Sequence, residues 1–534
     1  MSVAPADPRR VVHPPADGLG DAGLLGRRPR VAVVGGGIAG LAAATGLAER
    51  GVVVEVLERE PYLGGRVGAW PDRLPDGTAV SMGRGFHAFF RQYYNLRSLL
   101  RRADPGLRRL VALDDYPLID AEGRRDTFRG LPRTPPWNAV LFALRSPTFR
   151  PRDLAGLDPR AAAPLAAVSV PAIYEALDDV DAQTFLESIN FPPAARHLAF
   201  EVFSRSFFAP PSTMSAAELA TMFHIYFLGS SEGLMFDVPD DGFDTALWEP
   251  LRHYLTARGV GFRTGTRVSS VQRDVASGRF HVNHSSGGTE VDAVVLAADV
   301  PGLRDIVAGS DLGPGDGPPA VPAGPDALPA WREDVAALGS APPFLVYRLW
   351  LDRPVREDRP PFLGTGGLDP LDNISVLDRY ERDAATWAAR TGGSVVELHA
   401  YSAAVPAGTD EEAWTAELRS RCLARLHAIY PETAGARAVG ELVQWRRDCP
   451  MFGIGDFARR PGVVTPVDGL VLAGDGIRID LPVALMERAA STGWLAANRL
   501  LAGWGLAGHP LETVPTRGRF GPLRRAAEYA MRSR

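Results

Sequence analysis

Three glycines near the amino-terminal end of the chain have the spacing of a phosphate-binding turn. Gly35, Gly37 and Gly40 form a G-x-G-x-x-G pattern that follows a β-branched run at 30–34 and opens an Ala/Leu-rich helical pattern. In such a strand–turn–helix unit, the first glycine permits the tight turn, the second lets the backbone approach a pyrophosphate, and the third lets helix and strand pack closely. The N–H groups at the helix start would then face the phosphates.

A carboxylate stands where the ribose of a nucleotide would be expected. Residues 52–57 form a second β-branched run, which ends at Glu58 and would complete a strand–helix–strand unit. The carboxylate of Glu58 can accept hydrogen bonds from ribose hydroxyls. The glycine pattern alone is a weak signal, because Ala/Gly-rich sequences produce it by chance. Here the strand, the helix and the terminal acid occur together, and they predict a dinucleotide site.

A segment after Glu58 narrows the type of dinucleotide. The sequence GGR at 64–66 resembles a segment of the amine oxidase and phytoene desaturase superfamily of flavoproteins, at a slightly shorter spacing. In that superfamily the arginine, here Arg66, lies against the pyrophosphate of FAD. A nicotinamide-binding domain would not account for this segment, so we expect a flavin.

A third segment resembles the carboxyl-terminal flavin motif of the same superfamily. The stretch LVLAGDG at 470–476 reads as a strand that ends in A-G-D, where the aspartate, here Asp475, would bind the ribityl chain. The helical pattern at 484–493 matches the helix that follows, except that Arg488 replaces a glycine and Thr492 a serine. The positive end of this helix would point at the flavin and stabilise its reduced anion.

These resemblances imply one FAD, held without a covalent bond. Cys449 lies roughly where some relatives attach FAD covalently, but it lacks their Gly-Gly-Cys context. In this superfamily a backbone valine, here Val268, lies against the adenine. The residues expected to contact FAD are Gly35, Gly37, Ile38, Ala39, Gly40, Glu58, Arg59, Gly65, Arg66, Gly83, Arg84, Val268, Gly474, Asp475, Met486 and Glu487.

The stretch 82–96 points to one branch of this superfamily. It resembles the G-L-H-x-F-F-G-x-Y-x-N segment of carotene desaturases, with matches at Gly85, His87, Phe89, Phe90, Tyr93 and Asn95. Together with stretches at 131–136, 199–209, 224–238 and 474–499, it is similar to the actinobacterial β-carotene desaturase/methyltransferases, also called isorenieratene synthases. The resemblance covers nearly the whole chain from about residue 30 to residue 501.

This branch implies aromatisation of a β-ionone ring with a 1,2-methyl shift. Loss of a hydride from an allylic ring carbon leaves a delocalised cation, a methyl group migrates, a proton leaves, and a second oxidation completes the arene. The protein would position the substrate, exclude water and supply a base. The candidates for the base are His87, which lies in the specific segment, then His224 and Glu201. Quinone or oxygen would reoxidise the flavin.

Other activities of the same fold remain open. A linear carotene desaturase or a carotenoid cis–trans isomerase would use the same cofactor. An amine oxidase is disfavoured because the chain contains no Lys, which many amine oxidases place, through a water, at flavin N5. A non-enzymatic binder of the dissociation-inhibitor type is disfavoured because the flavin motifs are intact.

Composition excludes several function classes. The net charge of −5 gives no reason to expect a nucleic-acid partner. The two cysteines, Cys422 and Cys449, predict neither a disulfide framework nor a Cys-based metal site, and they fit a reducing compartment. Residues 31–48 carry no charge, but three consecutive glycines and the strand–helix interpretation argue against a membrane span.

The expected fold is α/β, a Rossmann-like FAD-binding domain built from discontinuous segments and interleaved with an α+β substrate domain. Strands are expected at 344–351 and 395–401, and a helix at 411–430; the runs at 279–283 and 291–296 are expected to pair around a Gly-rich turn. The predicted divisions are a disordered leader (1–29), FAD-binding segments (30–96, 241–307, 446–507), a mainly helical substrate region (97–240), a flexible Gly/Pro loop (308–332), a substrate sheet and helix (333–445) and a basic tail (508–534).

The apolar substrate and the basic tail predict an association with a membrane surface. A carotene partitions into the bilayer, so we expect a protein on the cytoplasmic side that docks peripherally with its cavity open to lipid. The tail carries six arginines around Leu523, Tyr529 and Met531 and could form a surface-binding helix, with a solvated tail as the alternative.

Overall fold

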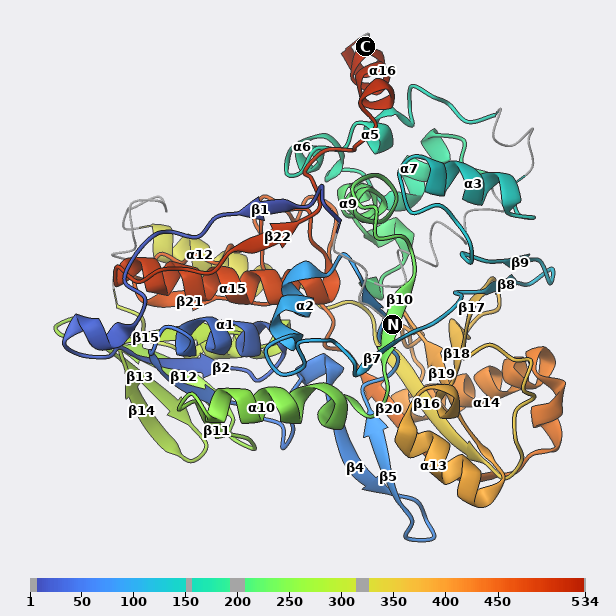
Figure 1. Ribbon diagram of the computed structural model, residues 1–534, viewed down its shortest axis with the longest axis horizontal. Helices are drawn as coiled ribbons and strands as arrows, with labels where there is room; N and C mark the ends of the chain where they lie inside the picture. Colours follow the sequence, from blue (N-terminus) through green and yellow to red (C-terminus); the bar gives the residue numbers. More distant parts are fainter. Residues whose placement is uncertain (1–6, 150–155, 193–206, 314–325, 533–534) are drawn as a thin grey trace.

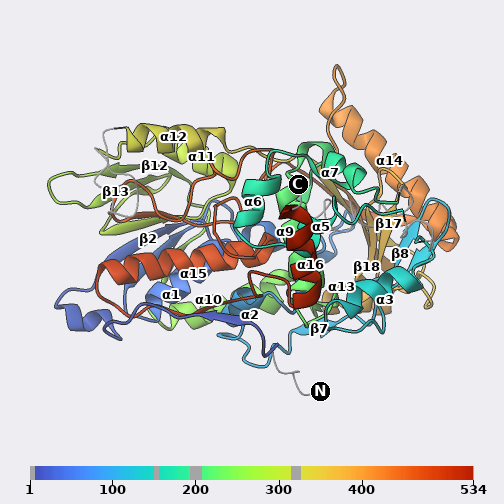
Figure 2. The ribbon, with the colours of Figure 1, turned by 90° about the horizontal axis from the view of Figure 1, so that it is seen from above.

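The computed structural model describes residues 7–149, 156–192, 207–313 and 326–532, which Figures 1 and 2 show from two directions. The described chain forms a parallel sheet with its helices, a larger and mostly antiparallel sheet with two helices, and a group of short helices beside both (Figure 1). This arrangement confirms the predicted α/β class, with a nucleotide-binding unit assembled from separate segments.

The nucleotide-binding unit is a five-stranded parallel sheet in the order β11-β3-β2-β15-β21. Its central strands are buried on both faces, which explains why they read as continuous β-branched runs. Helices α1 and α15 pack side by side against it (Figures 1 and 2). The bounds are β2 (Arg30–Val34), α1 (Ile38–Ala48), β3 (Val53–Leu57), β11 (Gly261–Arg263), β15 (Ala293–Leu296), β21 (Leu470–Leu472) and α15 (Leu485–Gly503).

One expected strand pairing is wrong. The run at 279–283 does not pair with 291–296: β13 (Phe280–His284) pairs with β14 (Gly287–Val291), which lies in the predicted turn, and with β12 (Val268–Arg273). The later run forms β15 and lies between β2 and β21. All four side chains of β15 are buried, and such a strand is stable at the centre of a covered sheet rather than in a hairpin.

The second sheet has seven strands in the order β20-β16-β19-β18-β17-β8-β9. It confirms the strands expected near 344–351 and 395–401, and the helix expected at 411–430. The bounds are β8 (Leu118–Asp120), β9 (Arg125–Asp126), β16 (Phe344–Leu351), β17 (Phe362–Gly366), β18 (Asn373–Val376), α13 (Arg382–Thr391), β19 (Ser394–Ala400), α14 (Glu411–Ile429) and β20 (Ala438–Arg446).

The region expected to be mainly helical also supplies strands to other parts. Its helices are α2 (Tyr94–Leu100), α3 (Trp137–Arg145), α5 (Ala163–Ala166), α6 (Ala172–Leu177), α7 (Ala182–Ser188), α9 (Ala216–Phe223) and the π-helix η6 (His224–Leu228). Its strands β7 (Leu110–Ala112) and β10 (Phe236–Pro239) form a small sheet with β6 (Phe89–Phe90), while β8 and β9 extend the second sheet. The remaining main elements are β4 (Ala69–Arg73), β5 (Ala79–Gly83), η7 (Asp244–Trp248), α10 (Glu249–Thr256), α11 (Val300–Ala308) and α12 (Ala327–Ala337).

The prediction of a disordered leader is wrong for residues 7–29. The strand β1 (Val11–His13) pairs with β22 (Leu511–Thr513), and a short helix, η1, covers Ala22–Leu25. Asp7 is buried and accepts hydrogen bonds from Arg519. The Pro/Gly-rich composition suggested disorder, but the partner of this segment lies at the other end of the chain, where local composition gives no sign of it.

The loop expected at 308–332 differs in its last part. Residues 314–325 lie outside the described residues. Ala327 already begins α12, whose Leu328, Trp331 and Val335 are buried. Their spacing is that of one helix face, so burial of an apolar stripe ends the loop earlier than predicted.

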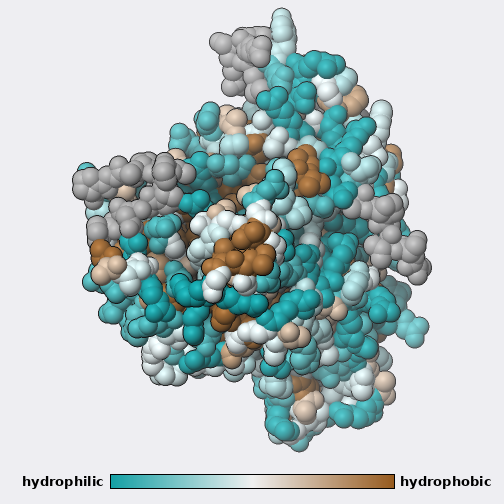
Figure 3. Space-filling view, turned by 60° about the vertical axis from the view of Figure 1, so that its left-hand side comes forward, coloured by the Kyte–Doolittle hydropathy of each residue, from teal (hydrophilic) through white to brown (hydrophobic). Residues whose placement is uncertain are grey.

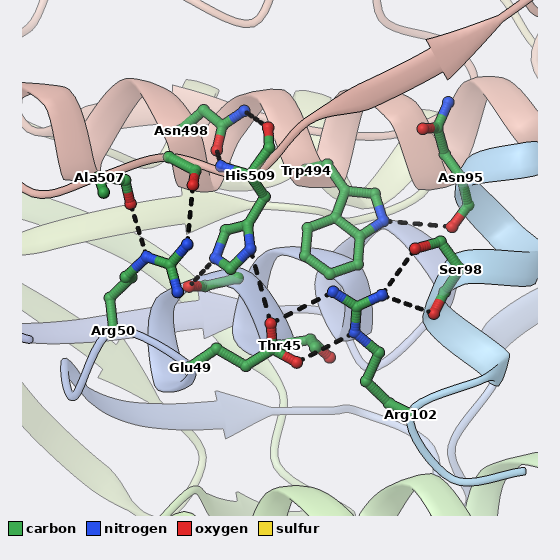
Figure 4. A network of polar contacts seen from close by, with 12 residues as sticks. Thr45, Glu49, Arg50, Asn95, Ser98, Arg102, Trp494, Asn498, Ala507 and His509 are labelled. Carbon is green, nitrogen blue, oxygen red and sulfur yellow. Dashed lines mark hydrogen bonds and ion pairs between the residues drawn. The ribbon is translucent and has the colours of Figure 1, made fainter. Parts of the chain in front are cut away.

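A network of polar contacts joins the helices of the nucleotide-binding unit to one another (Figure 4). Arg102, beyond α2, pairs with Glu49 at the end of α1 at 3.0 Å. The ring of His509 reaches the carbonyl of Gly46 within α1, and Trp494 on α15 donates to the carbonyl of Asn95. These contacts fix α1, α2 and α15 relative to one another, so the glycine turn at the start of α1 has a rigid support.

Candidate functional site

A single cavity of about 520 Å³ joins the nucleotide-binding sheet to the second sheet. Its lining begins at the glycine turn and Glu58, passes Arg66 and Asp475, and ends among aromatic side chains of the substrate region. A volume of several hundred Å³ with apolar walls and a few polar groups is typical of a small-molecule site.

The glycine turn has the geometry that a pyrophosphate requires. Gly35 has a φ of +107°, and a Cβ there would lie 2.5 Å from the carbonyl oxygen of Ala297. A Cβ on Gly40 would lie 1.9 Å from the carbonyl oxygen of Gly35, so this glycine serves helix–strand packing and does not line the cavity. Gly37 forms an isolated bridge with Gly64, which brings the GGR segment onto the same turn.

The start of α1 is open toward the cavity. Its N-cap is Gly37, so no side chain caps the helix, and Ile38 and Ala39 line the cavity. The first N–H groups of a helix lack partners within the helix and attract anions. The chain therefore presents backbone donors where a phosphate group would lie.

Glu58 lies directly after β3 at the cavity wall. Its carboxylate accepts hydrogen bonds from the backbone N–H groups of Gly36, at 2.6 Å, and Glu60, at 2.8 Å. Burial outweighs these bonds and raises the pKa of Glu58 above its usual value. Glu58 thus holds the glycine turn in place as well as facing the position expected for a ribose.

Two arginines mark the middle of the cavity. Arg66 forms an ion pair with Asp475, which follows β21, and Arg84 pairs with Asp448 at 2.6 Å. All four residues line the cavity. These pairs bring together side chains from the predicted GGR segment and the predicted A-G-D segment, although more than 400 positions separate Arg66 from Asp475.

The start of α15 also faces the cavity, through Leu485 and Met486. Arg488, which replaces a glycine of the family pattern, points away and pairs with buried Glu218 on α9 at 2.7 Å. Glu218 also pairs with Arg460 at 2.8 Å. Within the described residues, the unusual arginine therefore belongs to a buried ion triad that attaches α15 to the helical region.

Besides Gly40, two expected cofactor residues, Glu487 and Gly83, lie outside the cavity lining. The carboxylate of Glu487 accepts hydrogen bonds from the backbone N–H groups of Asn95 and Leu96, at 2.8 and 2.9 Å, and so caps the start of α2. Gly83 offers its carbonyl to Gln444. Neither residue lines the cavity, whereas the expected residues Arg59, Gly65, Val268 and Gly474 do.

The far end of the cavity is aromatic. Phe86 packs on Phe362 with ring centroids 4.2 Å apart, and Phe90 packs on Tyr226 at 4.7 Å. The expected apolar helices contribute in part: Phe207, Phe208, Met222 and Tyr226 line the cavity, while Phe200 and Phe203 lie outside the described residues. This end can surround a large apolar group without water.

The three candidate bases have different surroundings. His87 lines the cavity, and its Nδ1 lies 2.8 Å from the carbonyl oxygen of Gly85. His224 is fully buried at the start of η6, and its Nε2 lies 2.7 Å from the carbonyl oxygen of Pro515, away from the cavity wall. Glu201 lies outside the described residues. The sequence did not single out Tyr401 and Asn373, which line the cavity from the second sheet.

The observed donor set fits FAD. An open helix start and side-chain-free turn fit a pyrophosphate, a strand-end carboxylate fits a ribose, and the cavity continues from them past Arg66 into the aromatic region. The residues that would hold FAD are Gly35, Gly37, Ile38, Ala39, Glu58, Arg66, Val268, Gly474 and Asp475.

The chain resembles known flavoproteins along most of its length. Residues 38–501 match the family described as flavin containing amine oxidoreductase. A carotenoid phi-ring synthase of Streptomyces griseus is 56% identical over 521 residues, 97% of this chain and 96% of the relative. A carotenoid phi-ring synthase of Chlorobaculum tepidum is 29% identical over 92% of this chain and 91% of its own length.

Solved structures show the same fold at low identity. A putrescine oxidase variant superposes with a TM-score of 0.62 at 18% identity, over 89% of this chain and 99% of the other. Cyclohexylamine oxidase from Brevibacterium oxydans gives a TM-score of 0.60 at 14% identity. The matched family, the whole-length relative and the fit of the cavity agree, and the chain is a member of the flavin containing amine oxidoreductase family, in its carotenoid desaturase branch, and an FAD-dependent oxidoreductase.

Proposed function

We propose that this protein aromatises the β-ionone ring of a carotenoid by desaturation with a 1,2-methyl shift. The observation that carries the proposal is the continuity of the cavity from the nucleotide end to a wall of aromatic side chains. The name of the relative that shares 56% of its residues, a carotenoid phi-ring synthase, supports the same substrate class.

FAD supplies a hydride acceptor when it is bound. The chain itself supplies orientation and exclusion of water. Phe86, Phe362 and Phe236 pack against one another at the apolar end, with centroid distances of 4.2 to 5.9 Å. Their ring faces can stabilise a delocalised carbocation by cation–π attraction, and they keep water from trapping it before the methyl group migrates.

Expression in cells that already make β-carotene tests the proposal. We expect the pigment to become an aryl carotenoid, which loses four hydrogens per ring and keeps every carbon. A product with the mass of β-carotene would indicate an isomerase instead. Unchanged pigment, together with rapid reduction of the flavin by an amine, would contradict a carotenoid substrate.

We further propose peripheral docking of this protein at an anionic membrane surface on the cytoplasmic side, with quinone or oxygen as the electron acceptor. None of the described helices combines the length and apolarity that crossing a bilayer requires.

Helix α3 exposes Trp137, Val140 and Leu144, whose side chains are 60%, 43% and 69% exposed and share one face. Exposed Arg129 and Arg145 lie beside this face. Such a surface fits anionic lipid.

The predicted basic tail contributes less than its composition suggests. The side chain of Arg519 is buried and pairs with Asp7, and Arg524 pairs with Glu528 at 3.5 Å. Helix α16 (Gly521–Arg532) still exposes Arg525 and Tyr529. Some arginines of the tail therefore pair with carboxylates of the protein itself and are not free to bind a membrane surface.

Flotation with anionic vesicles at low salt checks the docking surface. The full chain should float, and a Trp137→Ser, Leu144→Ser double variant should float several-fold less. Leu24→Ser is the matched control, because Leu24 is 68% exposed but lies in η1, beside the nucleotide-binding unit and at the other end of the molecule from α3 (Figure 1). The face that Figure 3 brings forward is mainly hydrophilic around an apolar patch near its centre. Wild-type protein that stays at the bottom would contradict peripheral docking.

A further inference from the structure

A buried row of polar side chains runs through the second sheet and ends at the cavity. Glu397 and His399 lie on β19, and Tyr401 follows it directly, so the three alternate positions put their side chains on one face of the strand. Glu397 and His399 are essentially inaccessible, at 0% and 1% exposure, whereas Tyr401 lines the cavity. Buried charged and polar groups in a row are costly unless each has its partner.

The contacts of Glu397 show which ring nitrogen of His399 donates a hydrogen bond. One carboxylate oxygen accepts two hydrogen bonds from Arg348 on β16, at 2.9 and 2.7 Å, and the other lies 2.8 Å from Nε2 of His399. Burial opposes ionisation of Glu397, but Arg348 and His399 outweigh it and lower its pKa to about 2. Nε2 of His399 has two neighbours, the Glu397 carboxylate at 2.8 Å and the backbone N–H of Phe86 at 3.3 Å. Because an ionised carboxylate only accepts hydrogen bonds and lies closer, Nε2 donates to Glu397, and Nδ1 is the acceptor nitrogen of the ring.

The acceptor nitrogen of His399 faces the hydroxyl of Tyr401. The two atoms, Nδ1 and Oη, are 2.6 Å apart. The amide of Asn373 donates to the same hydroxyl oxygen at 3.1 Å. Because the oxygen accepts from Asn373, its own proton is directed at His399. The hydrogen bonds therefore run in one direction from Asn373 to Glu397, which also accepts from Arg348 on its other side.

The segment that marks the carotene desaturase branch is shaped around this histidine. Gly85 has a φ of +95°, and a Cβ there would lie 2.9 Å from Cε1 of His399 and 3.0 Å from its Nε2. The next residue, Phe86, is one of the aromatic walls of the cavity. The glycine therefore leaves room for the imidazole ring directly behind the apolar end of the site.

We propose that Tyr401, backed by His399 and Glu397, accepts the proton that the substrate ring loses after each hydride loss; this inference rests on the proposed function. The ring C–H bond breaks, and its electron pair fills the neighbouring cationic carbon as a new C=C bond. The proton bonds to Oη of Tyr401 while the hydroxyl proton passes to Nδ1 of His399. The positive charge thus moves from the substrate to His399, beside the Glu397 carboxylate. FAD, as the hydride acceptor, is the oxidant, and water that enters after product release takes the proton back along the same path.

The surroundings of His87 are less suited to this role. Its Nδ1 is occupied by the carbonyl of Gly85, and burial outweighs that bond and lowers the pKa of His87 to about 4. A proton on His87 is therefore costly at neutral pH, whereas His399 lies 2.8 Å from the carboxylate of Glu397, whose negative charge faces the ring. His87 therefore lines the cavity without taking the proton, and Tyr401 is the group that contacts the substrate and accepts it.

Single-turnover kinetics of the purified, FAD-loaded protein with β-carotene test the proposal. In Tyr401→Phe and His399→Gln, bleaching of the oxidised flavin should keep its wild-type rate, because hydride loss comes first. Formation of the aromatic ring should fall by about 10²–10⁴-fold, the usual contribution of a positioned base. Ring-deuterated substrate should then give a larger isotope effect on aromatic product than in wild type, a readout that a merely structural role would not move.

Tyr430→Phe is the matched control. Tyr430 is 1% exposed and packs in the core beside the same sheet, and its hydroxyl lacks a hydrogen-bond partner among the described residues. This variant should keep wild-type product, FAD content and melting temperature. Full aromatisation by Tyr401→Phe, or an equal fall of flavin bleaching and ring formation in both variants, would overturn the relay. Absence of aryl product from wild type would instead reject the proposed function.

Discussion

At the scale of single residues, Glu58 carries two tasks at once. Its carboxylate faces the position expected for a ribose, and it also accepts hydrogen bonds from the backbone of Gly36 and Glu60. The residue therefore couples nucleotide affinity to the shape of the glycine turn. The sequence indicated the first task from spacing, and the second follows only from the folded turn.

Replacing Glu58 by Ala should weaken FAD binding. The loss of the ribose acceptor, which also leaves the buried N–H of Gly36 and the half-buried N–H of Glu60 unpaired, corresponds to about 1–3 kcal/mol, or roughly a tenfold to hundredfold increase in Kd. Titration of the apoprotein with FAD, followed by quenching of flavin fluorescence, measures it. Glu55→Gln is the control, because Glu55 lies on the same strand but pairs with Arg263 at 2.6 Å. Equal affinity of Glu58→Ala and wild type would contradict the assignment.

The sequence predicted the site residues that belong to a short motif of neighbouring positions. It did not predict the contacts of residues whose partners lie far away along the chain. Gly35 and Asp475 belong to short motifs whose chemistry is written in neighbouring positions, and both line the cavity. Glu487 belongs to such a motif too, but its carboxylate is used by α2, nearly 400 positions away. The row behind Tyr401 gave no signal either, because alternate polar residues in an otherwise apolar strand look like an ordinary half-buried edge.

At the scale of elements, α15 depends on a buried ion triad. Burial opposes ionisation of Glu218, but Arg488 and Arg460 outweigh it and lower its pKa to about 2. Both guanidinium groups also lie over the ring of Phe452, at 4.8 and 4.6 Å. The triad links α15, whose first residues face the cavity, to α9, whose Met222 lines the apolar end.

Glu218→Gln should destabilise the protein strongly. It leaves two buried guanidinium groups without a countercharge, for which about 3–5 kcal/mol is typical. Glu249→Gln removes an exposed partner of Arg252 and should cost less than about 1 kcal/mol. Thermal unfolding of the two variants side by side measures the difference. A melting temperature of Glu218→Gln equal to that of Glu249→Gln would show that the triad is dispensable.

The π-helix η6 makes stability depend on pH. Burial outweighs the hydrogen bond to Pro515 and lowers the pKa of His224 to about 4. Between pH 6.5 and pH 4 the unfolded chain therefore takes up a proton that the folded chain does not, so stability is full above pH 6.5 and falls on acidification, by about 3 kcal/mol at pH 4. Midpoints of urea unfolding at pH 7 and pH 5 should differ less in His224→Gln than in wild type. Equal pH dependence would contradict this.

At the scale of the whole molecule, the first and last described segments of the chain pair with each other. The pairing of β1 with β22 and the buried contact of Arg519 with Asp7 tie residues 7–13 to residues 511–519. The same carboxyl-terminal segment offers Pro515 to His224. The α/β class and the discontinuous nucleotide-binding unit were predicted from the sequence, because their motifs are local. The pairing of β1 with β22 was not predicted, because it joins two segments that composition alone classes as a leader and a tail.

The central claim, migration of a ring methyl group during aromatisation, is tested most directly by position labelling. Purified holoenzyme would receive β-carotene that carries carbon-13 in the two methyl groups of the quaternary ring carbon, with an acceptor for repeated turnover. The account predicts that carbon NMR of the product finds the two labelled methyl groups on adjacent carbons of a benzene ring. A product in which both labels remain on one sp³ carbon would contradict it, even if the polyene had been desaturated.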